Sequence, residues 1–183
     1  TENDKWRKVV TQQEDGSLLS HEDDRDWGRR YTFQNQRLLY WPLLMSGDYD
    51  LMSQFFNYYS DMLPVRKAIT KSWFGHDGAY YRDNIEPTGA ERDCGRDGKP
   101  IKVAPGENVG QGYYHSFYFT SGLEITAMMI DYANHTDDKA FKEDILLPFA
   151  REVLLFFDKH YERDSSGMLR LDPAMVLETW WVA

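Results

Sequence analysis

The chain has 183 residues, which is enough for one domain with a sizeable core. Its 30 acidic residues outnumber 21 basic ones, giving a formal charge of −9 and no basic stripe, so a nucleic-acid partner is not expected. No apolar run is long enough to span a bilayer, and the single cysteine, Cys94, excludes an internal disulfide. Aromatic residues make up 15% of the chain, a content that suits either bulky helix packing or a cleft for sugar rings.

Residues 1–30 are polar and contain an acidic cluster, and we interpret them as a linker or entering loop before a domain that covers 31–183. The first predicted helix covers 34–46, and Pro42 inside it should bend or interrupt it. The second covers 48–70, where apolar residues recur at steps of three and four until Pro64 marks a possible break.

Residues 72–112 are rich in Gly, Pro and Asp, and a loop this long in a compact domain is expected to carry function. A third helix, 115–134, is apolar on nearly every face, so it should be packed on all sides. A fourth, 138–161, has a one-sided apolar stripe, a Thr-Asp-Asp cap before it and a restart at Pro148.

The predicted elements therefore alternate between buried and half-exposed helices, which is typical of helical hairpins arranged in a ring. Two hairpins cannot close a ring. We therefore expect an all-α chain that forms part of a larger helical toroid, with the remaining part of the barrel or another chain covering the inner helices.

Three segments are similar, in order and spacing, to one family. Residues 35–42 begin with Asn and end in Tyr-Trp-Pro; residues 74–89 begin with Phe-Gly-His-Asp-Gly; residues 167–178 place Gly, Leu and Pro at the family's intervals before Glu178. These segments resemble the inverting α-L-fucosidases and their relatives, and the chain looks closest to a poorly characterised bacterial fucosidase-like group. The resemblance covers roughly residues 25–183.

The resemblance implies an (α/α)6 catalytic barrel of the six-hairpin type and hydrolysis of a glycosidic bond with inversion. Glu178 matches the family's general acid, and the family's general base falls beyond residue 183, so residues 1–183 alone should be inactive. A secreted, periplasmic or cell-surface location is also implied, although the sequence shows no signal segment. The expected partner is an oligo- or polysaccharide substrate.

Three positions depart from the family pattern: Phe33 replaces one of two water-orienting asparagines, Arg82-Asp83 replaces a His pair, and Thr88 replaces a Trp. The departures at Phe33 and Arg82-Asp83 favour a second hypothesis, a non-catalytic glycan-binding domain on the same barrel. A third hypothesis, a polysaccharide lyase, needs a tyrosine or histidine base near a uronate, for which Tyr80, Tyr81 and Tyr113 are candidates.

The candidate site residues combine carboxylates, amides and indoles, the groups that donate protons to, hydrogen-bond and stack on sugars. The catalytic candidates are Glu178 and Asn35, and the substrate-binding candidates are Gln36, Trp41, Trp73, His76, Asp77, Asn84, Glu86, Trp180 and Trp181. Ordinary structural roles compete with these assignments: capping for Glu178, Asn35 and Gln36, a stabilised turn for Asp77, and core packing for the tryptophans. The five histidines share no ligand spacing, so neither a metal site nor a cofactor is expected.

Overall fold

The computed structural model describes residues 31–85, 87–89, 118–172, 174–177 and 180–182, and the strands at 10–12 and 18–20. It divides the chain into two units, Thr1–Arg30 and Tyr31–Ala183. In the first unit, β1 (Val10–Gln12) pairs antiparallel with β2 (Leu18–Ser20), a strand pair that the sequence analysis did not predict.

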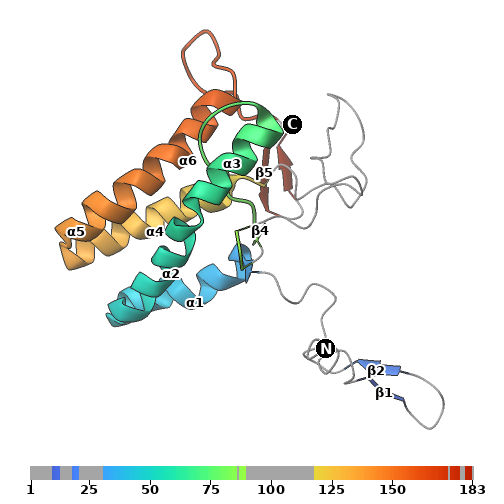
Figure 1. Ribbon diagram of the computed structural model, residues 1–183, viewed down its shortest axis with the longest axis vertical. Helices are drawn as coiled ribbons and strands as arrows, with labels where there is room; N and C mark the ends of the chain where they lie inside the picture. Colours follow the sequence, from blue (N-terminus) through green and yellow to red (C-terminus); the bar gives the residue numbers. More distant parts are fainter. Residues whose placement is uncertain are drawn as a thin grey trace. The chain divides into compact units, whose positions relative to one another are not determined.

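The second unit is mostly helical, in agreement with the predicted helical class (Figure 1). Its elements, in chain order, are β3 (Tyr31–Thr32), α1 (Phe33–Ser46), α2 (Tyr49–Asp61), α3 (Leu63–Phe74), β4 (Asn84–Ile85), α4 (Thr120–Thr136), α5 (Lys139–Phe141), a π-helical turn (Lys142–Leu146), α6 (Leu147–His160), β5 (Ala174–Leu177) and β6 (Trp180–Val182). The described strands of this unit form two antiparallel pairs, β3 with β4 and β5 with β6.

The first two predicted helices exist, with different internal breaks. Helix α1 runs unbroken through Pro42 and ends where Gly47, at φ 81°, donates its backbone N–H to the Leu43 carbonyl. The predicted helix 48–70 is divided close to the possible break marked at Pro64, because α2 ends at Asp61 and α3 runs from Leu63 to Phe74. Pro64 lies in the first turn of α3. Backbone N–H groups there have no acceptor within the helix, so proline, which lacks an N–H, costs no hydrogen bond.

The third predicted helix begins later than expected, at Thr120, and it is not packed on all sides. Ile130 is 45% exposed, whereas Met128 and Met129, which precede it, are fully buried. The fourth predicted helix, 138–161, is present as α5, the π-helical turn and α6, and two of its predicted features are confirmed. Asp138 caps α5 by accepting the Phe141 N–H at 3.0 Å, and Pro148 lies in the first turn of α6.

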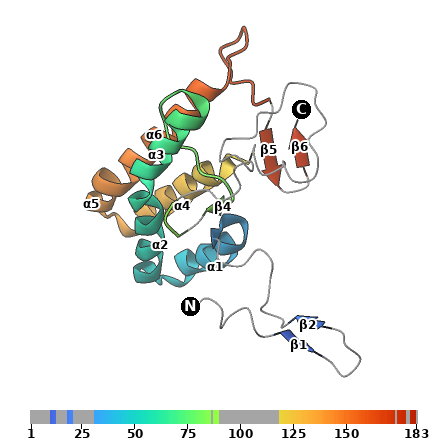
Figure 2. The same ribbon diagram turned by 45° about the vertical axis from the view of Figure 1, so that its right-hand side comes forward.

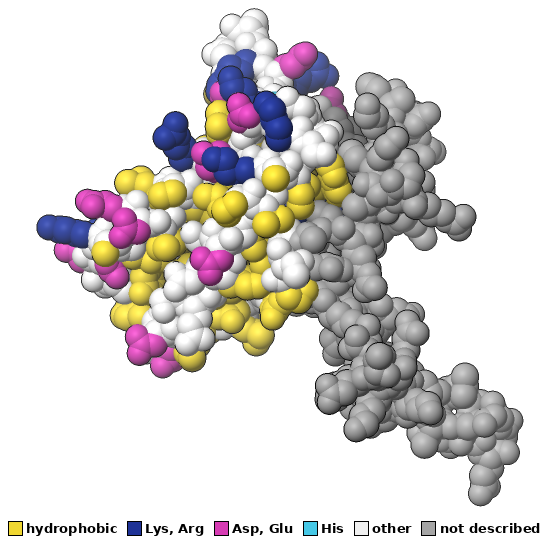
Figure 3. Space-filling model, viewed as in Figure 1, with side chains coloured by type: hydrophobic (Ala, Val, Ile, Leu, Met, Phe, Trp, Pro, Cys, Tyr) yellow, Lys and Arg dark blue, Asp and Glu magenta, His cyan; other side chains and the backbone are white. Residues whose placement is uncertain are grey.

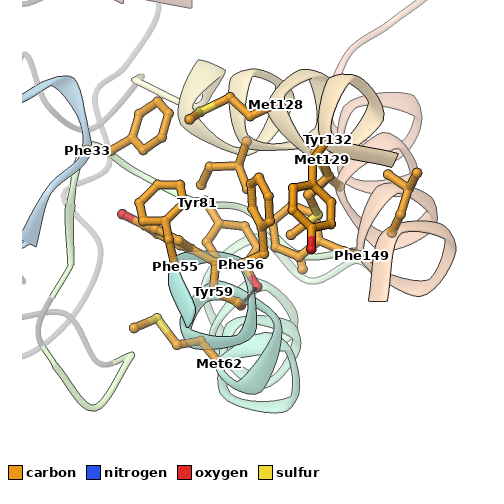
Figure 4. Close-up of a cluster of buried hydrophobic side chains, with 14 of the residues drawn as sticks. Phe33, Phe55, Phe56, Tyr59, Met62, Tyr81, Met128, Met129, Tyr132 and Phe149 are labelled. Atoms are coloured by element: carbon orange, nitrogen blue, oxygen red, sulfur yellow. Dashed lines mark hydrogen bonds between the residues drawn. The ribbon is translucent and has the colours of Figure 1, made fainter. Parts of the chain in front are cut away.

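The core lies between α2, α4 and α6, and aromatic side chains dominate it (Figure 4). Phe56 and Tyr59 of α2 are completely buried, as is Phe149 of α6. Burying each large apolar side chain contributes about 1.5–3 kcal/mol, so the aromatic content is largely explained by packing. Phe33 belongs to this core as well, stacked on Phe55 at 6.4 Å.

Helices α1 and α4 lie side by side, and their N-terminal ends are at the same end of the helical unit, next to β4 (Figures 1 and 2). Hydrophobic side chains also remain on the surface of this unit (Figure 3). On α1 they include Leu38, Leu39 and Met45, which are 68%, 70% and 83% exposed.

Candidate functional site

Asp83 fixes the start of α1 from a distant point in the chain. Thr32 occupies the N-cap position but makes no side-chain capping bond. Instead, the Phe33 N–H donates to the Asp83 carbonyl at 2.8 Å, and the Gln34 N–H donates to the Asp83 carboxylate at 2.7 Å. Because Asp83 is 1% exposed, its carboxylate serves as a buried cap of α1.

Asn84 reaches the same end of α1 through the strand pair β3–β4. Thr32 is paired with Asn84 in this ladder, and the Thr32 hydroxyl donates to the Asn84 side-chain oxygen at 2.6 Å. Asn35, in the first turn of α1, is exposed. The structure therefore brings two predicted site residues, Asn35 and Asn84, to one end of one helix.

Glu124 joins α4 to α1 at this end, and the sequence analysis did not identify it. Its carboxylate accepts a hydrogen bond from the Arg37 guanidinium at 2.6 Å and another from the Trp41 indole N–H at 3.3 Å. The Arg37 and Glu124 side chains are 23% and 28% exposed, so the pair is still reached by solvent. One signal was available, since Glu124 is the only charged residue between Ser116 and Ile130.

Gln36 faces the core side of α1 rather than open solvent. The Tyr59 hydroxyl donates to the Gln36 side-chain oxygen at 2.6 Å, and burial raises the pKa of Tyr59 well above its usual value, with smaller contributions from Tyr58 and Asp83. Tyr59 therefore stays neutral and remains a donor. Gln36 is held in place, and its amide nitrogen is the group available for another partner.

His76, Asp77 and Trp73 form a second neighbourhood, whose described partners belong to α3, α6 and the segment after α3. Asp77 accepts a hydrogen bond from Lys71 at 3.0 Å, and this contact with Lys71 lowers the pKa of its exposed carboxyl. His76 contacts His160 of α6 at 3.1 Å. The prediction that these residues join Asn35 in one site finds no support among the described contacts.

Arg66 connects the two neighbourhoods and was also missed by the sequence analysis. It is completely buried on α3, donates from Nε to the Tyr80 carbonyl at 2.8 Å and from Nη1 to the Gly89 carbonyl at 3.2 Å. Its guanidinium lies 4.3 Å from the centre of the Tyr80 ring, within cation–π range. Arg66 thus clamps both ends of the segment that carries Asp83 and Asn84.

Several predicted residues lie outside the described part of the chain. Glu178 and Glu86 are among them, and the side chains of Trp180 and Trp181 are as well. Strand β5 ends at Leu177 and β6 begins at Trp180, so the described residues on either side of Glu178 belong to strands.

The end of α1 therefore presents amides, a guanidinium–carboxylate pair and an indole within two helical turns. Such groups exchange hydrogen bonds with hydroxyls in both directions, since the carboxylate accepts and the guanidinium donates. Among the described residues, no group of three or more His, Cys, Asp or Glu is placed to hold a metal ion.

A scan against protein-family models finds no match for this chain, and searches of curated proteins and of solved structures also find none. None of the helices in the described ranges is both long and apolar enough to cross a membrane.

Proposed function

We propose that this chain is part of a glycoside hydrolase domain built as an (α/α)6 toroid, which cleaves a glycosidic bond with inversion. Glu178 would protonate the departing oxygen, and Asn35 would help to place the attacking water. The base and the remaining helical hairpins would come from further protein. The proposed substrate is an oligo- or polysaccharide outside the cell, in the periplasm or at the cell surface.

One observation carries this proposal within the described residues: the polar end of α1, defined here as Asn35, Arg37, Trp41, Asn84 and Glu124. Arg37, Trp41 and Glu124 are joined by hydrogen bonds, and Asn84 is held to the residue that precedes α1. Half-exposed polar side chains beside an indole are the combination that sugar hydroxyls and sugar C–H faces require.

Exposed apolar residues of α1 support the toroid. Leu38, Leu39 and Met45 are more than two-thirds exposed on α1, which would be an inner helix of the proposed toroid. Leaving several large apolar side chains in water forgoes the free energy of burial, about 25 cal/mol per Å². Further helical hairpins packed against α1 would recover it.

A non-catalytic glycan-binding domain is the second candidate, and two observations favour it. Phe33, at the position of a water-orienting asparagine in the resembling family, is completely buried in the core and cannot orient water. Arg82 and Asp83, which replace a sugar-bordering His pair, are 5% and 1% exposed, and Asp83 is used as the cap of α1. A domain that binds sugar without hydrolysing it would need neither a water-orienting asparagine at position 33 nor the His pair at positions 82 and 83.

The lyase hypothesis gains no support from the described tyrosines. Tyr80 and Tyr81 are almost completely buried, and burial raises the pKa of Tyr81 far above its usual value. A tyrosine base must instead lose its proton near neutral pH. Tyr113, the third candidate, lies outside the described residues.

The decisive experiment measures binding and hydrolysis in the same intact protein. A glycan array identifies a bound sugar, and NMR of the released product then reports the anomeric configuration. Hydrolysis with inversion that falls by about 10²–10⁴-fold in Glu178→Gln supports the proposal. The matched control is Glu162→Gln, at an exposed position after α6.

Three results would contradict the hydrolase proposal or part of it. Binding without hydrolysis in the wild-type protein establishes the non-catalytic candidate. Undiminished hydrolysis by Glu178→Gln removes Glu178 from the role of acid. Products with an unsaturated ring, seen by their ultraviolet absorption, would instead indicate a lyase.

A further inference from the structure

His76 and His160 form a hydrogen-bonded imidazole pair between the loop after α3 and the last residue of α6. His76 Nε2 lies 3.1 Å from His160 Nδ1, and His76 Nδ1 lies 2.8 Å from the Asp77 carbonyl oxygen. A carbonyl only accepts, so His76 Nδ1 carries a hydrogen in this arrangement. In neutral His76 the Nε2 atom is then an acceptor, and His160 Nδ1–H is the donor.

This pair is a proton-sharing contact rather than a metal site. A zinc ion lies about 2.0–2.1 Å from each ligating nitrogen. The ring centres are 5.4 Å apart and the two nitrogens only 3.1 Å apart, so the rings point at each other along the line between the nitrogens. That gap is too short for an ion on the line.

The proton count of the pair decides whether the contact exists. With no added proton, or with one, a single hydrogen lies between the two nitrogens and the hydrogen bond is made. With two added protons both nitrogens carry hydrogens, and two positive rings face each other. The contact is then repulsive at short range, in a setting that screens charge poorly.

Aromatic rings enclose the pair on the His160 side. Phe156 stacks on His160 at 4.8 Å, and Phe74, Phe119 and Tyr161 meet its edges or faces within 5.1 Å. This burial, followed by the charge of His76, lowers the pKa of His160 to about 4.

Among the residues that the structure describes, few charged groups are placed to offset the lowered pKa of His160. On α3, Lys71 binds the Asp77 carboxylate at 3.0 Å, and Asp77 is exposed. On α6, Lys159 acts on Asp77, and Asp158 is paired with Arg163. The segment before α4 supplies Phe119, which is uncharged, and Tyr80 and Tyr161 are the neighbouring phenols.

The pair holds a segment that is fitted closely to α6. Gly78 has φ +106°, and a Cβ added there would lie 2.4 Å from the Phe156 backbone nitrogen. The next residue, Ala79, donates its N–H to the Glu152 carbonyl at 2.8 Å. The chain then continues through Tyr80 to Asp83, the cap of α1.

We propose that the His76–His160 pair is an acid-sensitive latch, which docks residues 75–79 on α6 and releases them when both imidazoles are protonated. The contact between Gly78 and α6 contributes packing but does not titrate. The free energy that docks residues 75–79 on α6 therefore has two parts. The packing of Gly78 does not change with pH, and the contribution of the His76–His160 latch does.

The direction of the pH dependence follows from proton linkage. In the docked state His160 has a pKa of about 4, below its ordinary value of 6.5. Between these values the docked state binds fewer protons than the released state, so acid favours release. The latch's contribution is complete above about pH 6.5 and is lost as the pH falls through about 4.

NMR of the intact chain tests the latch without any ligand. At pH 7, imidazole nitrogen shifts should show hydrogens on Nδ1 of both His76 and His160. On acidification, His160 should gain its proton near pH 4, and the amides of residues 75–79 should lose protection from hydrogen exchange with the same midpoint. His135, exposed on α4, is the internal reference.

Two variants separate the histidines from the nearby carboxylate. His160→Phe keeps an aromatic ring in the enclosure and should abolish the pH-dependent step in exchange. Asp77→Asn removes the charge that binds Lys71 and should leave the midpoint in place. Loop opening near pH 4 in His160→Phe, or a loss of the step in Asp77→Asn, would overturn the proposal.

If His160→Phe does not fold, the wild-type titration still decides. A His160 that titrates near 6.5, or that carries its hydrogen on Nε2 at pH 7, contradicts the latch. So does exchange of residues 75–79 that does not change between pH 7 and pH 3.5.

Discussion

The polar end of α1 and the His76–His160 pair use buried and half-buried polar groups in opposite ways. At the polar end of α1, Arg37 and Glu124 remain 23% and 28% exposed and can exchange partners with a ligand. At the histidine pair, aromatic rings enclose the imidazoles and lower the pKa of His160 to about 4. The first arrangement suits recognition of hydroxyls, and the second suits a response to protons.

One segment joins these two regions, since it leaves His76 and ends at Asn84. Arg66 binds this segment at the Tyr80 carbonyl, between the two regions, and at the Gly89 carbonyl beyond them. The two regions therefore share one stretch of chain, which Arg66 holds through two hydrogen bonds. Replacing Arg66 tests this hold, and further variants test each region.

Replacing Arg66 should have the largest effect on stability. Arg66→Met removes charged donors from two carbonyl groups and a cation–π contact, so the free energy of unfolding should fall by about 3 kcal/mol in urea titrations. The matched control is Arg151→Met, at an exposed position of α6, with an expected change within about 0.5 kcal/mol. Equal losses in the two variants would refute the clamp.

Gly78 and Gly75 provide the next test, because both have positive φ but only one is crowded. In Gly78→Ala the new Cβ meets the Phe156 backbone, whereas a Cβ added at Gly75 meets no non-neighbouring atom of the described residues within 4 Å. Gly75→Ala should cost about 1 kcal/mol from backbone strain alone, and Gly78→Ala clearly more. Urea titration of the two variants measures both losses of stability. Equal losses in Gly75→Ala and Gly78→Ala would mean that residues 75–79 are not docked on α6 as described.

Glu124→Gln should have the smallest effect on stability of these variants, and its main effect should be on sugar binding at the polar end of α1. Half-exposed ion pairs contribute about 0–1 kcal/mol, so the melting temperature should change by only a few degrees. Affinity for the sugar found on the array should fall by about tenfold, measured by calorimetry. Glu143→Gln, at an exposed position in the π-helical turn, is the control. An unchanged affinity would remove Glu124 from the site.

Several elements of the fold could be predicted from local chemistry. The apolar periodicity of α2 and α6, the stop at Gly47 and the cap at Asp138 each act within a few residues, so they are visible in the sequence. The later start of α4 at Thr120 was not predicted, because Tyr118 and Phe119 are as apolar as the residues of the helix itself.

The candidate site was predicted less completely, since its contacts join distant parts of the chain. Asn35 and Asn84 were identified from a family resemblance, and the structure places both at the end of α1. Glu124 and Arg66 were not identified, because their partners are distant in the sequence. Glu124 lies 87 residues from Arg37, and Arg66 lies 23 residues from Gly89, so no local pattern relates them.

The sequence by itself determined that the described part of this chain is mostly helical, roughly where its helices lie, and the one-sided apolar stripes of α2 and α6. Only the tertiary structure decided that Asp83 caps α1, that Glu124 binds Arg37 and that His76 shares a hydrogen with His160. The reason is physical. Helix propensity and capping act over one or two turns, whereas the pairing of buried polar groups depends on which distant segments the packed core brings within about 3 Å.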